Sequence, residues 1–224
     1  MRKLMACLVA LVATTGGSVS ASVLYSQPFN SGNPQGFSSQ NDTNLGGFGN
    51  FATAYDNFRL TTSSLVNNVQ WTGVYFNPAA AAPINGFTLQ FLANNAGTPG
   101  AVLYTANISG NANETSLGNF GGFPYFTYSA NLSTPFTALA GQTYWVSVVP
   151  NIGFPPQWGW AAGTGGDGAA YQTFFGTGAP IGSDLAFQLN GSAVPEPISL
   201  VVFGGLLVGG AGIALRRRMT KAAA

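Results

Sequence analysis

Ile84-Asn85-Gly86-Phe87-Thr88-Leu89-Gln90-Phe91-Leu92 is the stretch that decides the fold. Its three central apolar residues alternate with Thr88 and Gln90, a period of two that predicts a β-strand with one buried face. Residues 94–100 are Asn-Asn-Ala-Gly-Thr-Pro-Gly, and their Asn, Gly and Pro content is typical of a turn. A sequence typical of a strand resumes over residues 101–108. We therefore expect these two strands to form a hairpin or a corner of a sandwich.

Similar short runs of β-branched and aromatic residues recur along the chain, separated by Gly, Asn, Ser and Pro. They occupy residues 23–29, 51–60, 66–76, 125–132, 143–149, 157–161, 170–175 and 184–189. Residues 30–49 are rich in Gly, Asn and Ser, and we expect a long loop there. Roughly ten short strands without a fixed repeat predict one all-β domain, an antiparallel β-sandwich with jelly-roll-like connectivity.

Charge is scarce in the part of the chain that carries these strands. The chain of 224 residues has a formal net charge of +1 and no histidine. Residues 22–193 contain one base, Arg59, and five acids, a net charge of −4. These acids are Asp42, Asp56, Glu114, Asp167 and Asp184. Without lysine or histidine this segment has no means to neutralise phosphates, which argues against nucleic-acid binding, and it lacks the histidine of a catalytic triad or a typical zinc site.

The N-terminus has the three parts of a secretory signal peptide. Met1-Arg2-Lys3 is basic, residues 4–13 are apolar, and Val19-Ser20-Ala21 has the small-x-small form that signal peptidase recognises. We expect residues 1–21 to be removed by cleavage after Ala21. Cys7, the single cysteine, lies in this segment, so the mature chain needs no disulfide.

The C-terminus predicts a membrane span. Residues 198–215 contain no charged residue, and as a helix of about 27 Å they are nearly long enough to cross a bilayer core. Arg216, Arg217 and Arg218 follow at once and favour a cytoplasmic position for this end of the helix. Residues 22–193 are therefore expected outside the cytoplasmic membrane as an ectodomain.

The tripeptide Pro195-Glu196-Pro197, the Gly-rich apolar helix at 198–215 and the Arg-rich tail at 216–224 occur in this order. Residues 194–224 thereby resemble the PEP-CTERM sorting signal of exported bacterial proteins. The resemblance implies that an exosortase, a membrane enzyme, binds this segment and cuts near the tripeptide. The prolines agree with this interpretation, because they push the residues before them toward extended conformations. A plain single-span tail anchor after a proline-rich linker is the alternative.

The ectodomain also resembles a recurring domain of PEP-CTERM proteins over most of residues 51–190. The matching stretches are Tyr55-Asp56-Asn57-Phe58-Arg59-Leu60, Val69-Gln70-Trp71-Thr72-Gly73-Val74-Tyr75, Phe87-Thr88-Leu89-Gln90-Phe91, Gly97-Thr98-Pro99-Gly100, Tyr144-Trp145-Val146-Ser147, Trp158-Gly159-Trp160 and Asp184-Leu185-Ala186-Phe187-Gln188-Leu189. This resemblance implies a surface-exposed β-sandwich of unassigned biochemistry. Asn57 departs from it, because relatives often carry a second acid at this position.

Two groups of residues in the ectodomain are candidate ligand sites. Trp158 and Trp160 lie two residues apart on one strand face, the spacing of a sugar-stacking platform, although aromatic residues in sandwiches are more often core. Trp71, Trp145, Tyr125 and Tyr128 would complete a glycan groove. The second group is Asp56 and Asp184, with Asp42 and Asp167, which could converge on Ca²⁺ or simply cap turns.

The sequence favours a non-enzymatic exported protein without a cofactor, either structural or binding, and a lectin-like module of the exopolysaccharide matrix is the main alternative. A glycoside hydrolase would need two carboxylates, for which Asp56 and Asp184 are candidates unsupported by spacing. Ice binding would need flat Thr-x-Thr arrays, and the sequence has none. The expected partners are signal peptidase, exosortase, the membrane and exopolysaccharide.

Overall fold

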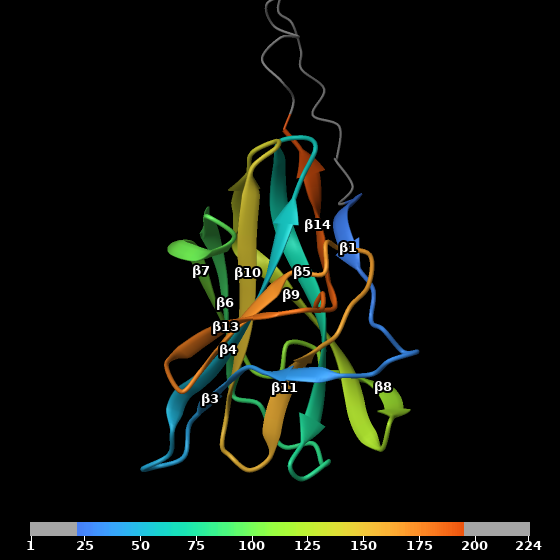
Figure 1. Cartoon of the computed structure of the whole chain (residues 1–224), viewed down its shortest axis with the longest axis vertical. Helices are drawn as coiled ribbons and strands as arrows, with labels where there is room; N and C mark the ends of the chain where they lie inside the picture. Colours follow the sequence, from blue (N-terminus) through green and yellow to red (C-terminus); the bar gives the residue numbers. More distant parts are fainter. Residues whose placement is uncertain (1–21, 195–224) are drawn as a thin grey trace, which may run out of the picture.

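A computed structural model describes residues 22–194, which form fourteen β-strands and no helix (Figure 1). The all-β, antiparallel fold predicted from the alternating pattern is confirmed. Within residues 22–194 there is consequently no helix of the length and apolarity needed for a membrane span. The predicted signal peptide and the predicted sorting signal from Pro195 onward lie outside the described residues.

The strands form two sheets of seven. The first sheet consists of β1 (Ser22–Gln27), β14 (Phe187–Ala193), β5 (Ser64–Phe76), β9 (Phe123–Ala138), β8 (Thr115–Phe120), β11 (Gln157–Ala161) and β2 (Gly36–Ser38). The second consists of β13 (Thr177–Ile181), β12 (Ala170–Phe174), β4 (Gly49–Arg59), β3 (Gln40–Asp42), β10 (Thr143–Ile152), β6 (Gly86–Asn95) and β7 (Thr98–Ser109). All strand pairs are antiparallel except β3 with β10.

Strand β5 organises the first sheet because it is long enough to pair with three strands. One edge pairs first with β14 and then, from Gly73 onward, with β11. The other edge pairs with β9 along most of its length. The predicted hairpin around residues 94–100 is β6 and β7, joined by the tight turn Ala96-Gly97.

Four parts of the chain differ from the sequence prediction. The expected loop at residues 30–49 contains β2 and β3, each only three residues long. Strand β2 pairs with β11, more than a hundred residues away, and β3 lies between the nearby β4 and the distant β10. Strands β8 and β13 were not predicted, because they are hairpin returns with little burial and therefore no clear alternation. The strand expected at residues 184–189 starts only at Phe187, although Leu185 forms an isolated bridge with Ala162.

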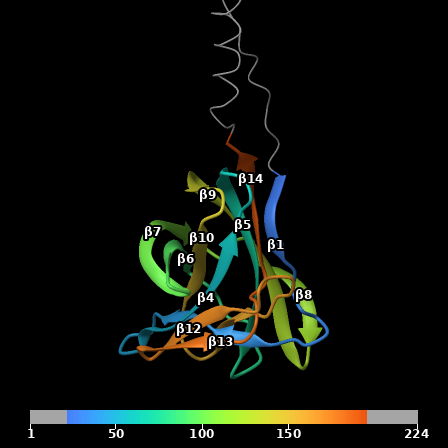
Figure 2. The ribbon, with the colours of Figure 1, turned by 45° about the horizontal axis from the view of Figure 1, so that its top comes forward.

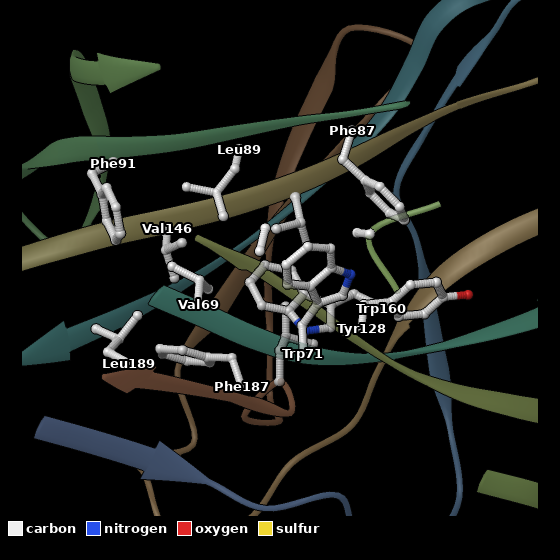
Figure 3. Packing of buried hydrophobic residues seen from close by; sticks show 14 of the residues in the cluster. Val69, Trp71, Phe87, Leu89, Phe91, Tyr128, Val146, Trp160, Phe187 and Leu189 are labelled. Carbon is white, nitrogen blue, oxygen red and sulfur yellow. The ribbon is translucent and has the colours of Figure 1, made fainter. Parts of the chain in front are cut away.

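The space between the sheets is filled mainly by aromatic and large aliphatic side chains (Figure 3). Phe87, Leu89 and Phe91 are buried there, as their alternation predicts. Trp71 stacks on Tyr128 with ring centroids 5.7 Å apart and planes 9° apart. Each such ring buries about 150–250 Å², so these contacts supply much of the driving force for folding.

A short chain of hydrogen bonds joins Tyr75, Tyr128 and Trp158 of this aromatic core to Glu114. The buried Trp71 Nε1, in contrast, has no hydrogen-bond partner among the described residues. Glu114 Oε2 accepts hydrogen bonds from the hydroxyls of Tyr75, at 2.6 Å, and Tyr128, at 2.8 Å. The Tyr128 oxygen accepts in turn from Trp158 Nε1 at 3.1 Å. Burial, and then the nearby Tyr75 and Glu114, raise the pKa of Tyr128 far above its usual value, so its hydroxyl stays a donor.

The two ends of the described chain leave the domain at the same place. Ser22 of β1 pairs with Gly191 of β14, and the Val194 amide donates to the Ser63 carbonyl at 2.7 Å. Both ends lie at the top of the domain in Figures 1 and 2. The turn between β3 and β4 lies at the opposite end.

We predict that Gly73→Ala destabilises the domain, because a Cβ at residue 73 would overlap the Trp158 indole. Overpacking of this kind typically costs about 1–3 kcal/mol, and we expect a loss of that size in the free energy of unfolding measured with urea. Gly182→Ala is the matched control, since no atom lies within 4 Å of its added Cβ. Equal stability of the two variants would contradict the role of Gly73.

Candidate functional site

Trp158 and Trp160 do not form a surface platform. Both indoles are 0% exposed, since alternation along β11 directs them into the space between the sheets. Trp158 Nε1 donates to Tyr128, and Trp160 Nε1 donates to the Ala186 carbonyl at 2.8 Å. The prediction that these two residues stack on a glycan is therefore wrong, because neither ring face is open to solvent.

Three other aromatic residues from the predicted glycan groove are core residues as well. Trp71, Trp145 and Tyr128 are each 2% exposed. Tyr125, the fourth, is also 2% exposed, but it pairs with Val74 in a small apolar cluster separate from the main core. This second cluster lines a groove at the C-terminal end of β5.

The groove has a volume of about 420 Å³, within the usual size range of small-molecule sites. Its walls come from β2, β5, the start of β9 and the two loops beside them. The lining residues are Pro34, Gln35, Gly36, Val74, Phe76, Asn77, Phe123 and Tyr125. Glycine is required at residue 36, because a Cβ there would overlap the Val74 side chain. The groove therefore depends on the close approach of Gly36 in β2 to the Val74 side chain of β5, which lies on the other side of β11.

The groove offers aromatic surface and neutral polar groups but no charge. Phe123 is 40% exposed and gives an open ring face, while Phe76 is half-buried. The polar groups are the side-chain amides of Gln35 and Asn77 and the hydroxyl of Tyr125. Within residues 22–194 no side-chain hydrogen bond occupies these three groups. Burial raises the pKa of Tyr125, so its hydroxyl stays protonated and can donate.

The two acids predicted as a calcium or catalytic pair, Asp56 and Asp184, do lie close together. Asp56 on β4 is 0% exposed, and its oxygens accept from the amides of Asn57, at 2.7 Å, and Leu185, at 2.6 Å. Gln27, with its amide nitrogen turned toward Asp56, adds a third donor at 2.6 Å. The carboxyl is thus enclosed by donors and is not open to a substrate.

Asp184 holds the loop that precedes β12. Its oxygens accept from the amides of Gly168, at 2.6 Å, and Gly166, at 2.9 Å. Asp167 in the same loop accepts from the Asn57 side-chain amide at 3.1 and 3.3 Å, which ties the loop to β4. Asn57, the residue that departs from the family resemblance, therefore has a structural role as a donor to Asp167.

These hydrogen bonds occupy the carboxyl oxygens of Asp56 and Asp184, which are therefore not available to bind a metal ion or to act as an acid or base in catalysis. Among the described residues no three His, Cys, Asp or Glu side chains come together as a metal site. The oxygens of Asp56 and Asp184 face N–H donors, which would repel a cation. Asp56 is also inaccessible as one member of a glycosidase pair, since it has no exposed surface.

Burial has a strong effect on the ionisation of Asp56. Desolvation raises its pKa to about 8 and outweighs the backbone hydrogen bonds from Leu185 and Asn57, which lower it; the charges of Asp184 and Asp167 add smaller upward contributions. The folded state therefore holds a proton on Asp56 at pH values where an exposed aspartate, with a pKa near 3.9, has lost it. The buried carboxyl acts as a neutral hydrogen-bonding group between β4 and the segment before β14.

Asp42, the remaining predicted calcium ligand, joins two loops. Its carboxylate accepts hydrogen bonds from the backbone amides of Asn44, Phe48 and Phe154 at 2.9–3.0 Å. Burial alone would raise its pKa, but these three bonds lower it. Asp42 is therefore an ionised residue that caps turns, the role predicted from the sequence as the alternative to calcium binding.

No protein-family model matches the chain, and no curated protein matches it. The site must therefore be judged on its geometry. The groove residues other than Tyr125 were not predicted from sequence, because they come from three separate segments without a common spacing. Weak signals existed in the Asn77-Pro78 stop after β5 and in the Gly121-Gly122 turn before β9, which mark loops but not their proximity.

We predict that Asp56 makes stability depend on pH. Its contribution is fully present below about pH 4, decreases as pH rises toward 8 and is lost above that value, because unfolding releases the bound proton. The free energy of unfolding should fall with a slope of up to about 1.4 kcal/mol per pH unit between pH 5 and 7.

Asp56→Asn should flatten this slope, while Asp42→Asn should lower stability but keep the slope, since Asp42 stays ionised over this range. Urea unfolding at several pH values measures both effects. An identical slope in the wild-type protein and Asp56→Asn would show that Asp56 does not hold the proton.

Proposed function

We propose that the chain is an exported, non-enzymatic cell-surface or matrix protein that carries a PEP-CTERM sorting signal, with a jelly-roll-like sandwich as its ectodomain. The sequence of its ends is the main support: signal peptide at 1–21, Pro195-Glu196-Pro197, an apolar span at 198–215 and three arginines at 216–218. In this proposal signal peptidase removes the first segment and an exosortase cuts near the tripeptide. The ectodomain then stays at the surface or in the matrix.

The position of the described ends supports this proposal. Ser22 is already paired in β1, and β14 ends at Ala193, one residue before Val194. Cleavage after Ala21 and near residues 195–197 would therefore leave all fourteen strands intact. The start of β1 and the end of β14 also lie side by side, at the end of the domain away from the last residues of β5, which line the groove (Figure 1).

For the ectodomain we propose binding of a neutral glycan in the groove at the end of β5. The observation that carries this is the combination of an exposed Phe123 ring with the unoccupied amides of Gln35 and Asn77 and the Tyr125 hydroxyl. Sugars present apolar ring faces beside hydroxyl groups, and these are complementary to aromatic rings and neutral donors or acceptors. The groove lacks charge, which favours a neutral polysaccharide over an acidic one.

The sorting proposal is tested by mass spectrometry of the protein isolated from its own cells. We expect an N-terminus at Ser22 and no peptide that contains residues 216–218. Glu196→Ala should retain the C-terminal arginines, because the tripeptide is the proposed recognition element. Ser192→Ala is the control and should be processed normally. A wild-type product that keeps its arginine tail would rule out exosortase cleavage.

The glycan proposal is tested by affinity electrophoresis in gels that contain dextran or hydroxyethylcellulose, with anionic alginate for comparison. Phe123→Ala and Gln35→Ala should each weaken retention by a neutral polysaccharide, by about tenfold for the loss of the ring. Leu139→Ala is the matched control, since Leu139 is 52% exposed and does not line the groove. Retention that is absent, or equal in all variants, would refute glycan binding at this groove without affecting the sorting proposal.

A further inference from the structure

Leu45 and five phenylalanines lie on the turn between β3 and β4 and on the loops next to it, at the end of the domain opposite β1 and the end of β14 (Figure 1). We call this cluster the aromatic tip. Its members are Leu45, Phe48, Phe51, Phe154, Phe174 and Phe175. They come from the turn between β3 and β4, the start of β4, the loop between β10 and β11, and the hairpin of β12 and β13.

The rings of the aromatic tip pack on one another across these loops. Phe175 lies 5.5 Å from Phe48 and 5.4 Å from Phe51, between ring centroids. Phe48 also meets Phe154 edge to face at 5.8 Å. Asp42 holds the underlying backbone in place through the amides of Phe48 and Phe154. The tip is therefore a preformed surface, assembled from segments far apart in sequence.

Much of this apolar surface is open to solvent. Phe48 is 59% exposed, Phe175 58% and Phe174 42%, and Leu45 is fully exposed. With about 150–250 Å² for each aromatic side chain, the three phenylalanines together present roughly 300 Å². Solitary exposed apolar residues need no explanation, but a contiguous patch of this size is often functional.

Phe175 is held in a conformation that its side chain disfavours. Phe175-Gly176 forms the two-residue turn between β12 and β13, with φ of +46° and +80°. Positive φ at both central residues is the type I′ turn, for which Asn-Gly is the preferred sequence. A bulky residue in the left-handed region is uncommon and strained. The chain thus places an exposed phenylalanine where a polar residue would favour the turn more.

Three binding partners are considered for the aromatic tip: a second copy of the chain, a glycan and a lipid surface. The exposed apolar area and the lack of free polar groups distinguish between them. A stable interface between two copies needs about 800 Å² from each partner, more than twice what these rings offer. A glycan would need free polar groups beside the rings, but Asn44 Nδ2 is already bonded to the Phe154 carbonyl and the Asp42 carboxylate is saturated. Loop tips with apolar side chains and no exposed charge are compatible with the acyl-chain region of a lipid layer.

We propose that the aromatic tip inserts into a neutral lipid surface. Leu45, Phe48, Phe174 and Phe175 enter the acyl boundary, and apolar burial alone drives the insertion. Arg59, the single base among residues 22–194, is not part of the tip, so binding does not depend on anionic lipid or on salt. Because the tip lies opposite Ser22 and Val194, it contacts a surface that is away from the chain ends.

The test uses the full chain with Cys7→Ser and Leu45→Cys, labelled at residue 45 with the fluorophore NBD. The chain is first incorporated into phosphatidylcholine nanodiscs, so that any other segment that enters lipid has done so beforehand. Phosphatidylcholine vesicles containing doxyl-labelled lipid are then added, and quenching of NBD by the vesicle lipid reports insertion of the tip. We expect quenching that is unchanged by added phosphatidylglycerol or by salt.

Phe175→Asn is the decisive variant, because it creates the preferred Asn-Gly turn while it removes the ring. It should raise the free energy of unfolding and still weaken vesicle binding about tenfold, the effect of losing one buried ring. Phe48→Ser should weaken binding by a similar factor. Leu103→Ser, which removes a 52% exposed side chain from β7, is the control and should leave binding unchanged.

The proposal is overturned if the vesicles do not quench the label, or if Phe175→Asn and Phe48→Ser bind like the parent protein. Self-quenching of NBD without vesicles, abolished by Phe175→Asn, would show that a second copy covers the tip and would equally overturn it. Each outcome is independent of glycan retention, which depends on the groove at the end of β5.

Discussion

Packing of aromatic rings between the two sheets is the interaction on which the rest of the structure depends. Strand β5 carries Trp71 and Tyr75 into this space, and Gly73 between them leaves room for the Trp158 indole from β11. Since β11 pairs only with the last residues of β5 and with the short β2, this indole contact helps to hold both strands in place. The groove at the end of β5 exists because these strands are fixed there.

The few acids of the domain are used in a consistent way. Asp42, Asp56 and Asp184 each accept backbone N–H groups from loops, and Glu114 accepts the hydroxyls of two core tyrosines. An ionised carboxylate such as that of Asp42 provides strong hydrogen bonds that keep long connections in one conformation. The neutral carboxyl of Asp56 serves the same purpose as a buried acceptor of backbone N–H groups. This explains why residues with the composition of a metal or catalytic site serve instead to position loops.

The groove and the aromatic tip differ in chemistry although both are aromatic. In the groove, Phe123 lies beside neutral amides and a hydroxyl, an arrangement suited to a ligand with both apolar faces and hydrogen-bonding groups. At the aromatic tip, the rings lie beside one another and the nearby polar atoms are already bonded. The groove is suited to binding a defined molecule through hydrogen bonds and ring contacts. The aromatic tip is suited to burial in an apolar environment. Both lie away from Ser22 and Val194, where the described residues begin and end.

The sequence by itself determined the all-β class, most strand positions and the inward residues of the clearest strands, such as Phe87, Leu89 and Phe91, because a period of two directly encodes which face is buried. It did not reveal β2 and β3, which are only three residues long and each depend on a strand more than a hundred residues away, β11 for β2 and β10 for β3 beside its neighbour β4. It also missed the exposed hairpin strands β8 and β13. Alternation along residues 157–161 also showed that Trp158 and Trp160 lie on the same face of their strand. It did not show whether that face is buried, because burial depends on where the second sheet packs. The groove and the aromatic tip were decided by tertiary structure alone, because each combines segments that are far apart in sequence. Strand order brings the groove segments together, and backbone bonds to the Asp42 carboxylate hold two of the loops at the tip.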